Sequence, residues 1–187
     1  FSPPSPSSTR EVEAEESVNY ELGWRHRGTA VTAELVAFFN DYDNLLGSDT
    51  LSTGGQGTGD QFNGGAAAVS GLEASLAVEL PPVSGVRLPA RLSYTHTRAR
   101  FRSDFATGFS DWAPRVERGD ALPYIPTHQL HAGLSAVGER WAAHLDTSYS
   151  GAMRTRAGRG PIPRRESIDA RLLVDLKVEV ALSARLR

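Results

Sequence analysis

Seven segments of the chain alternate apolar and polar side chains with a period of two. In the most regular segment, residues 168–186, the even positions are all apolar and the odd positions are mostly charged. Successive side chains of a β-strand point to opposite faces, so this pattern predicts strands with one apolar face and one polar face. Strands are expected at residues 17–27, 30–43, 67–80, 86–102, 127–137, 141–149 and 168–180, with an eighth beginning near Arg185 after a turn around Ala181–Ala184.

The connections between these strands are alternately short and long. Short turns are expected at Arg27–Thr29, Pro81–Gly85 and Gly138–Arg140, and long loops at residues 44–64, 103–123 and 151–165. Barrels of the bacterial outer membrane have short turns at one end and long loops at the other. The aromatic residues on the apolar faces fit an interfacial girdle: Tyr20, Trp24, Tyr94, Trp141 and Tyr149. The pattern therefore predicts an all-β, antiparallel, up-and-down transmembrane barrel segment, with the charged face lining the lumen.

Composition narrows the class of protein further. The longest apolar run in the 187 residues is Leu35–Phe39, far short of the ~20 residues that a membrane-spanning helix needs. The formal net charge of −2 gives no reason to expect a nucleic-acid partner. The absence of cysteine excludes disulfides, thiolate metal ligands and cysteine nucleophiles.

Four segments, in order, resemble the C-terminal barrel portion of TonB-dependent outer-membrane receptors. They are Phe1-Ser-Pro-Pro followed by residues 15–25 (EESVNYELGWR), residues 37–45 (AFFNDYDNL), residues 71–75 (GLEAS) and residues 122–130 (LPYIPTHQL). Within the family, the sequence of these segments is most similar to that of ferric-citrate-type siderophore receptors.

The resemblance implies a 22-stranded barrel in the bacterial outer membrane with a globular plug in its lumen. Residues 1–187 are then expected to be a partial barrel domain of about eight strands, without the plug and the final strands. The implied activity is transport of a ferric siderophore or another iron chelate, with no catalysis and no cofactor. The implied partners are the inner-membrane TonB complex, acting through the plug, and the surrounding membrane lipid and lipopolysaccharide.

Arginines concentrate in and before the second and third long loops. A guanidinium group binds carboxylates through two parallel hydrogen bonds, so a cluster at the outer mouth of a barrel would suit an anionic chelate such as ferric citrate. Contact with lipopolysaccharide phosphates, or plain solvation, is the alternative. The candidate ligand-binding residues are Arg100, Arg102, Arg115, Arg154, Arg156 and Arg159.

Other chemistry is less favoured by the sequence. His128 and His131 are three apart, which places them on opposite faces of a strand, and His144 and Asp146 share the lumen face without a third ligand. The acidic residues around Gly47 lack the glutamate that ends a calcium-binding loop, and residues 55–59 lack the lysine of a phosphate loop. No metal site and no catalytic residue is predicted.

Two other classes of protein stay open at this point. One is a self-contained small outer-membrane barrel, either an adhesin or a barrel enzyme. The other is a soluble β-sheet binding protein, whose aromatic residues would be ordinary core residues.

Overall fold

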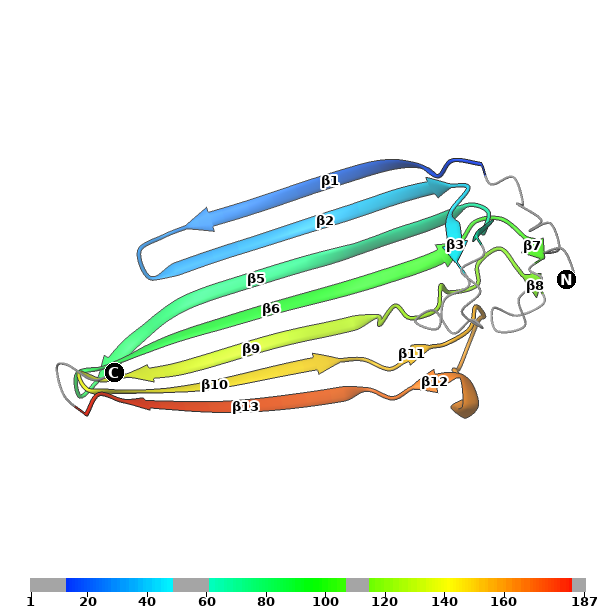
Figure 1. Ribbon diagram of the computed structural model, residues 1–187. Coiled ribbons are helices and arrows are strands. Elements are labelled where there is room, and N and C mark those ends of the chain that lie inside the picture. Colours follow the sequence, from blue (N-terminus) through cyan, green and yellow to red (C-terminus); the bar gives the residue numbers. More distant parts are fainter. Residues whose placement is uncertain (1–12, 49–60, 107–114, 183–187) are drawn as a thin grey trace, which may run out of the picture.

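The computed structural model describes residues 13–48, 61–106 and 115–182, and within them the chain forms one large antiparallel sheet (Figure 1). Three sequence features lie outside the described residues: the Phe1-Ser-Pro-Pro segment, the glycine-rich residues 55–59 and the eighth strand expected near Arg185. The seven strands of the sheet, in hydrogen-bonding order, are β1 (Glu16–Arg27), β2 (Val31–Asp43), β5 (Ala67–Val83), β6 (Val86–Phe101), β9 (His128–Val137), β10 (Trp141–Ser150) and β13 (Arg171–Val180).

The strand order follows the chain order, which confirms the predicted up-and-down topology. The hairpin turns at one end are tight: the Gly28 N–H donates to the Val31 carbonyl at 2.8 Å, and the Gly138 N–H donates to the Trp141 carbonyl at 2.9 Å. The turn between β5 and β6 is shorter than the sequence suggested, because β5 continues to Val83 and only Ser84 and Gly85 remain between the two strands. Both residues have positive φ, +50° and +81°, as a two-residue hairpin turn with the sheet's twist requires.

The long connections carry short strand pairs of their own, which the sequence analysis had left as loops. These pairs are β3 (Leu46–Ser48) with β4 (Gln61–Asn63), β7 (Phe105–Ala106) with β8 (Arg115–Val116), and β11 (Met153–Arg154) with β12 (Ser167–Ile168). A 3-10 turn, η2 (Arg164–Glu166), precedes β12. The strand expected to begin at Ile168 therefore begins at Arg171, because Ile168 pairs with Met153 in the loop.

One apolar face runs unbroken across all seven strands. The register aligns Trp24, Leu35, Ala74, Tyr94, Leu130, Tyr149 and Leu172 on a single rung of that face. It also assigns β2, whose faces the sequence left open: Leu35 and Phe39 belong to the apolar face, whereas Val36 and Phe38 belong to the other. The alternation of β2 is blurred because its second face carries these two apolar residues.

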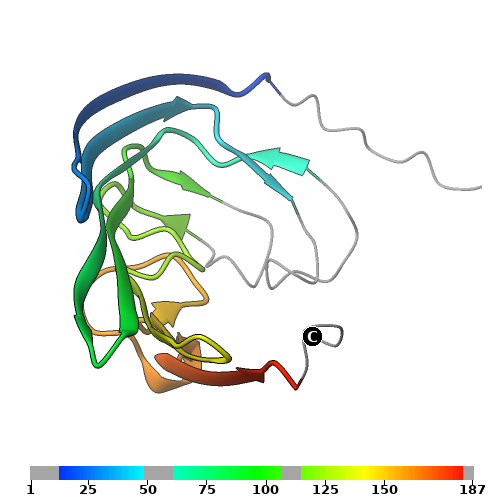
Figure 2. The same cartoon turned by 90° about the vertical axis from the view of Figure 1, so that its left-hand side faces the viewer.

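The apolar face is the outer, convex surface of a curved sheet. Figure 2 shows the strands as an arc, and the short strand pairs of the long connections lie inside it. The large apolar side chains of the outer face are strongly exposed, for example Leu22 at 78% and Leu176 at 72%. Such exposure over a whole sheet face suits contact with lipid and is unlike the surface of a soluble domain. We call this surface the lipid face and the opposite, concave one the lumen face.

The small core of the molecule lies at the loop end of the lumen face. Ala67, Phe101 and Val116 are almost fully buried there, and Tyr42, Leu45, Phe105, Leu122 and Ala157 pack around them. The Phe101 and Phe105 rings meet edge to face at 5.2 Å. Because Ala67 and Phe101 are cross-strand partners, this core attaches the folded loops to the ends of β5 and β6.

Candidate functional site

The three long connections join one another at the loop end of the sheet. The Arg102 N–H donates to the Ala66 carbonyl at 2.7 Å, which ties the first connection to the second. The Ala121 N–H donates to the Gly158 carbonyl at 2.8 Å, and the Tyr124 N–H donates to the Arg154 carbonyl at 2.8 Å, which ties the second to the third. Side chains of these connections therefore share one rim above the lumen face.

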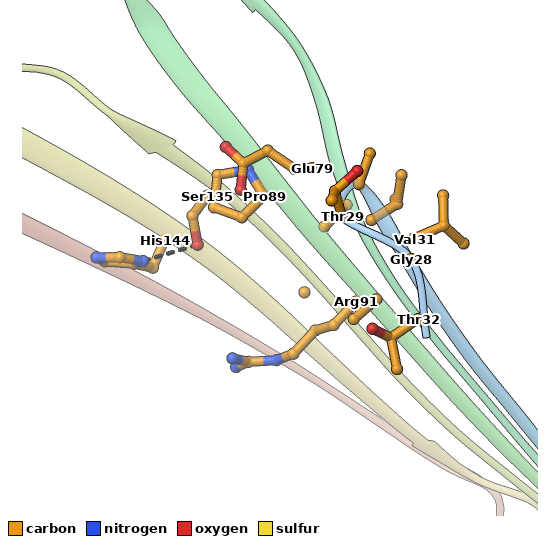
Figure 3. A pocket seen from close by; sticks show the side chains of 14 residues that line it. Gly28, Thr29, Val31, Thr32, Glu79, Pro89, Arg91, Ser135 and His144 are labelled. Atoms are coloured by element: carbon orange, nitrogen blue, oxygen red, sulfur yellow. Dashed lines mark hydrogen bonds between the residues drawn. The ribbon is translucent and has the colours of Figure 1, made fainter. Parts of the chain in front are cut away.

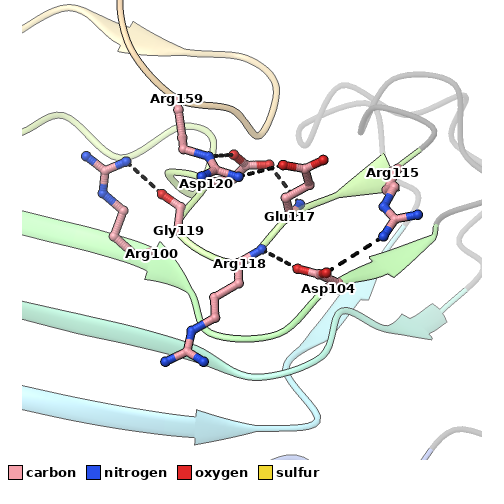
Figure 4. Close-up of polar contacts among 8 residues, drawn as sticks. All are labelled: Arg100, Asp104, Arg115, Glu117, Arg118, Gly119, Asp120 and Arg159. Atoms are coloured by element: carbon pink, nitrogen blue, oxygen red, sulfur yellow. Dashed lines mark hydrogen bonds and ion pairs between the residues drawn. The ribbon is translucent and has the colours of Figure 1, made fainter.

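A network of ion pairs links the second and third connections (Figure 4). Arg159 lies 3.0 Å from Asp120, between Nε and Oδ1, and 2.6 Å from Glu117, between Nη2 and Oε2. Asp120 is only 8% exposed, and its second carboxylate oxygen accepts a hydrogen bond from the Glu117 N–H at 2.9 Å. One guanidinium group thus serves two carboxylates, which leaves this part of the rim with a negative balance.

A third carboxylate of the second connection, that of Asp104, holds Arg115. Its guanidinium group lies 3.7 Å from the Asp104 carboxylate, and the same carboxylate accepts the Arg118 N–H at 2.6 Å. In Figure 4 the Arg118 side chain points away from this group. The Arg115 side chain is 69% exposed, so a ligand in the lumen mouth could replace its weak partner.

Arg154 supports the third connection from within. It is 7% exposed, and its Nη2 donates to the Gly160 carbonyl at 3.1 Å. Arg156, two residues further on, is half-buried, and Arg159 is exposed. Arg154 therefore shapes the loop that carries the other two arginines.

Arg100 and Arg102 lie elsewhere. Arg100 shares the outward parity of Tyr94 on β6, and Arg102 follows directly after the end of that strand. Arg100 donates to the Gly119 carbonyl at 2.9 Å, and Arg102 pairs with Asp41 of β2. The six arginines predicted to bind ligand thus divide into an outer pair and a rim group. Sequence reasoning missed the carboxylates that neutralise the rim group, although Asp104, Glu117 and Asp120 stand in the same loop.

Two clefts, of about 430 and 530 Å³, lie along the lumen face of the sheet. Figure 3 shows Thr32, Arg91, Ser135 and His144 around the first. His144 hydrogen-bonds Ser135 at 2.8 Å, and Arg91 of β6 reaches across β9 to Asp146 of β10 at 2.5 Å.

Gly133 makes room for the Arg91–Asp146 pair. It is the cross-strand partner of both residues, and a Cβ at this position would lie 2.7 Å from Asp146 Oδ1 and 2.8 Å from Arg91 Nε. The lumen face therefore carries an ion pair that spans three strands over a glycine.

The histidines take the faces that were predicted for them. His144 and Asp146 share the lumen face but have separate partners, and His131 faces the lumen while His128 faces outward. Among the described residues there is no group of three or more histidines, cysteines or carboxylates placed to hold a metal ion. No helix in the described ranges is long and apolar enough to cross a bilayer.

Comparisons with known proteins agree with this geometry. Residues 2–187 match the family model described as TonB dependent receptor-like, beta-barrel. No curated protein matches the chain significantly in sequence.

Several solved structures contain the same fold. The ferric-catecholate import receptor Fiu from E. coli K12 is 16% identical over 98% of the chain, with a TM-score of 0.62. The ferric enterobactin receptor PfeA from Pseudomonas aeruginosa is 23% identical over 92%, with a TM-score of 0.57, and the copper transporter OprC is 14% identical over 93%, with a TM-score of 0.60. The chain spans 24% of the length of each of these structures.

Proposed function

Since the chain belongs to the TonB-dependent receptor-like β-barrel family, we propose that it forms part of the barrel wall of an active importer of a ferric siderophore. Its place is the bacterial outer membrane, and the family consists of transporters and not of enzymes. Membership of this family excludes the two alternatives that the sequence left open, a self-contained small outer-membrane barrel and a soluble β-sheet binding protein. The observation that carries the proposal is the continuous lipid face opposite a polar, clefted lumen face, with all long connections gathered at one rim.

The seven strands are proposed to be a segment of a larger closed barrel. Within the described residues β1 and β13 each pair on one side only. Unpaired backbone groups in hydrocarbon cost several kcal/mol each, so both edges call for neighbouring strands. In the complete receptor the lumen face would surround the plug, through which the TonB complex would supply energy.

For the ligand we propose an iron chelate with negative charge, of which ferric citrate is one example. The supporting feature is the exposed guanidinium group of Arg115, whose contact to Asp104 is weak, with Arg156 and Arg159 on the neighbouring connection. Arg159 would bind the chelate by giving up its exposed partner Glu117 while it keeps Asp120. Arg154 would hold the loop of Arg156 and Arg159 in place. The chelate proposal does not extend to Arg100, whose side chain leaves β6 on the lipid face, or to Arg102, which pairs with Asp41 on the lipid face of β2.

Uptake by the full-length receptor tests the function. The receptor is produced in a bacterium that lacks its own siderophore receptors, and radioactive iron is supplied as citrate, catecholate or hydroxamate chelate. Saturable uptake of an anionic chelate that disappears when TonB is deleted supports the proposal. Uptake that is independent of TonB, or transport of free copper in place of every iron chelate, contradicts it.

A matched pair of variants tests the rim arginines. Replacing Arg115, Arg156 and Arg159 together by alanine should weaken chelate binding about tenfold or more, since each charge-assisted hydrogen bond is worth ~1.5–3 kcal/mol. The control replaces Arg164 and Arg165 of η2, which lie on the same connection, and Arg165 is 87% exposed with only a 3.6 Å contact to Glu166. Equal affinity of both variants for the chelate would overturn the assignment of these residues.

A further inference from the structure

The register of the sheet brings together two histidines that are far apart in the sequence. His96 of β6 and His128 of β9 are direct cross-strand partners on the outward face. The Thr97 N–H donates to the Thr127 carbonyl at 3.0 Å, so the two histidines form a non-hydrogen-bonded pair, the kind in which side chains lie closest. Their ring centroids are 5.2 Å apart. Spacing along the chain pairs His128 only with His131, which lies on the opposite face, so this group emerges only from the register of the sheet.

A third polar side chain reaches the same pair. Tyr94 lies two residues before His96 on β6, and its hydroxyl oxygen is 2.8 Å from Nδ1 of His128. The Tyr94 and His128 rings are stacked, with centroids 6.1 Å apart. The phenol therefore leans along the outward face toward the histidines. One phenol oxygen and two imidazole rings meet where β9 begins.

The separations within this group fit three ligands of one metal ion. Two ligand atoms that bind one ion at right angles, each at ~2.0–2.1 Å, are ~2.9 Å apart, and Tyr94 Oη and His128 Nδ1 are 2.8 Å apart. A hydrogen bond has the same length, so the second separation is needed. Two imidazoles bound to one ion at the tetrahedral angle have ring centres about 5 Å apart, and those of His96 and His128 are 5.2 Å apart.

The surroundings leave the group accessible. His96 makes no hydrogen bond or ion pair with the described residues, so its ring can turn to present a nitrogen. On the same rung, Leu72 lies opposite His96, and Gly151, which has no side chain, lies opposite His128. His128 is exposed. Water therefore reaches the group and can complete the coordination of a bound ion.

We propose that Tyr94, His96 and His128 bind a divalent transition-metal ion, with Cu²⁺ bound most tightly. Imidazole suits Cu²⁺, Ni²⁺ and Zn²⁺, and among these ions Cu²⁺ has the highest affinity for such ligands. On binding, the Tyr94 hydroxyl gives its proton to water, and two metal–ligand bonds replace its hydrogen bond to His128. The site differs from the clusters of histidine, cysteine and carboxylate considered above, because its third ligand is a phenol. It lies on the outward face, away from the arginines proposed to bind the chelate.

The neighbouring cation Arg98 gives this site a distinctive property. Arg98 is exposed and lies two residues beyond His96 on the same face, about 7 Å along the strand. A divalent ion and a guanidinium group at this range repel each other, although water screens the interaction. Replacing Arg98 by alanine should therefore tighten Cu²⁺ binding by about two- to fivefold.

Copper titration of the full-length receptor in detergent tests the site. Metal is first removed with EDTA, and the affinity and stoichiometry of added Cu²⁺ are measured by calorimetry. We expect one Cu²⁺ ion whose affinity falls at least about tenfold in H96A and in H128A, the lower end of what losing a supporting group costs at a metal site. Zn²⁺ should bind more weakly, and excess Mg²⁺ should not displace Cu²⁺. The matched control H131A removes a histidine of the same strand from the lumen face and should leave the affinity unchanged.

Spectroscopy separates a ligand role of Tyr94 from a structural one. A phenolate bound to Cu²⁺ gives a visible charge-transfer band, and imidazole ligands give nitrogen couplings in the electron paramagnetic resonance spectrum. Y94F should lose the band, keep the nitrogen couplings and bind Cu²⁺ more weakly. A tyrosine that only orients His128 would give no such band in the wild-type protein.

Three results would each overturn the proposal. They are unchanged Cu²⁺ affinity in folded H96A/H128A, no charge-transfer band in the wild-type complex, and Cu²⁺ binding by R98A that is no tighter than that of wild type. Retarded migration of unheated protein on a gel verifies that each barrel is folded. The site takes no part in the proposed uptake of iron chelate, so failure of either proposal leaves the other standing.

Discussion

Arg159 and Asp120 join two loops of the rim across 39 positions of the chain, with Nε and Oδ1 3.0 Å apart. Because the aspartate is nearly buried, its charge depends on this partner and on the Glu117 N–H for compensation. The contact therefore does more than an ordinary surface ion pair, and it fixes the loop that carries the proposed ligand-binding arginines.

Replacing Asp120 by alanine should release the third connection. Losing about 1 kcal/mol of local stability corresponds to roughly a fivefold larger open population, so trypsin should cleave after Arg156 and Arg159 several times faster in D120A. The melting temperature of the barrel should not change. In the control E117A, which removes one exposed ion pair, cleavage should rise less than twofold. Equal cleavage rates in D120A and wild type would show that the loop is held by other contacts.

Arg91 should reduce repulsion between two carboxylates on the lumen face. The register places Asp146 directly opposite Asp175, and Arg91 holds Asp146 from two strands away. Removing the guanidinium group in R91A should cost up to ~1 kcal/mol in the free energy of unfolding, a modest amount because both side chains are partly exposed. D175N should recover part of that cost in the R91A background and change little by itself. Urea titration of the four proteins in detergent measures the coupling, and additive effects would rule it out.

Gly71 is predicted to tolerate no side chain. A Cβ at this position would overlap the His96 carbonyl and lie 2.5 Å from the Phe38 ring, so G71A must displace backbone as well as side chain. We expect a loss of ~1–3 kcal/mol in the free energy of unfolding.

Gly23 is the matched control for this substitution. It lies on the lumen face of β1, where a Cβ would meet nothing closer than 3.6 Å, so G23A should be close to neutral. Unfolding in urea compares the two variants, and similar stabilities would contradict the close approach seen at Gly71.

The two faces of β13 should respond oppositely to charge. Leu176 is 72% exposed on the lipid face, and arginine near the membrane midplane costs ~2–4 kcal/mol. L176R should therefore lower the folding yield in lipid vesicles, whereas K177A on the lumen face should fold normally. Equal yields of the two variants would contradict the assignment of Leu176 to the lipid face and Lys177 to the lumen face.

The sequence predicted most of the wall and little of the rim. The strands, their order and their outward faces follow from an apolar–polar period of two, because one face of each long strand contacts lipid. The predicted order was correct, and the predicted strand ends were correct within a few residues. Three wall details were missed: the faces of β2, the end of β5 and the start of β13. Phe38 lies on the lumen face against Gly71, and Ile168 pairs with Met153 in the third long connection. Both are contacts between segments that are distant in the sequence.

The rim was harder to predict because its geometry is set by loop-to-loop contacts. Counting arginines identified a basic region but not the division between the outer pair, Arg100 and Arg102, and Arg159, which lies between Asp120 and Glu117. The alternation along β6 could have shown that Arg100 faces outward, because it is an even position like Tyr94. Nothing in local sequence indicated which carboxylate would meet Arg159.

The alternation of faces also sets a rule for how the length of this wall can change. Inserting one residue in the middle of β13 would turn Asp175, Lys177 and Glu179 toward lipid and their apolar neighbours toward water as far as the next turn. Inserting two residues would restore both faces and only lengthen the strand. Changes in the strands are therefore expected in pairs, whereas the rim connections are free to gain or lose single residues.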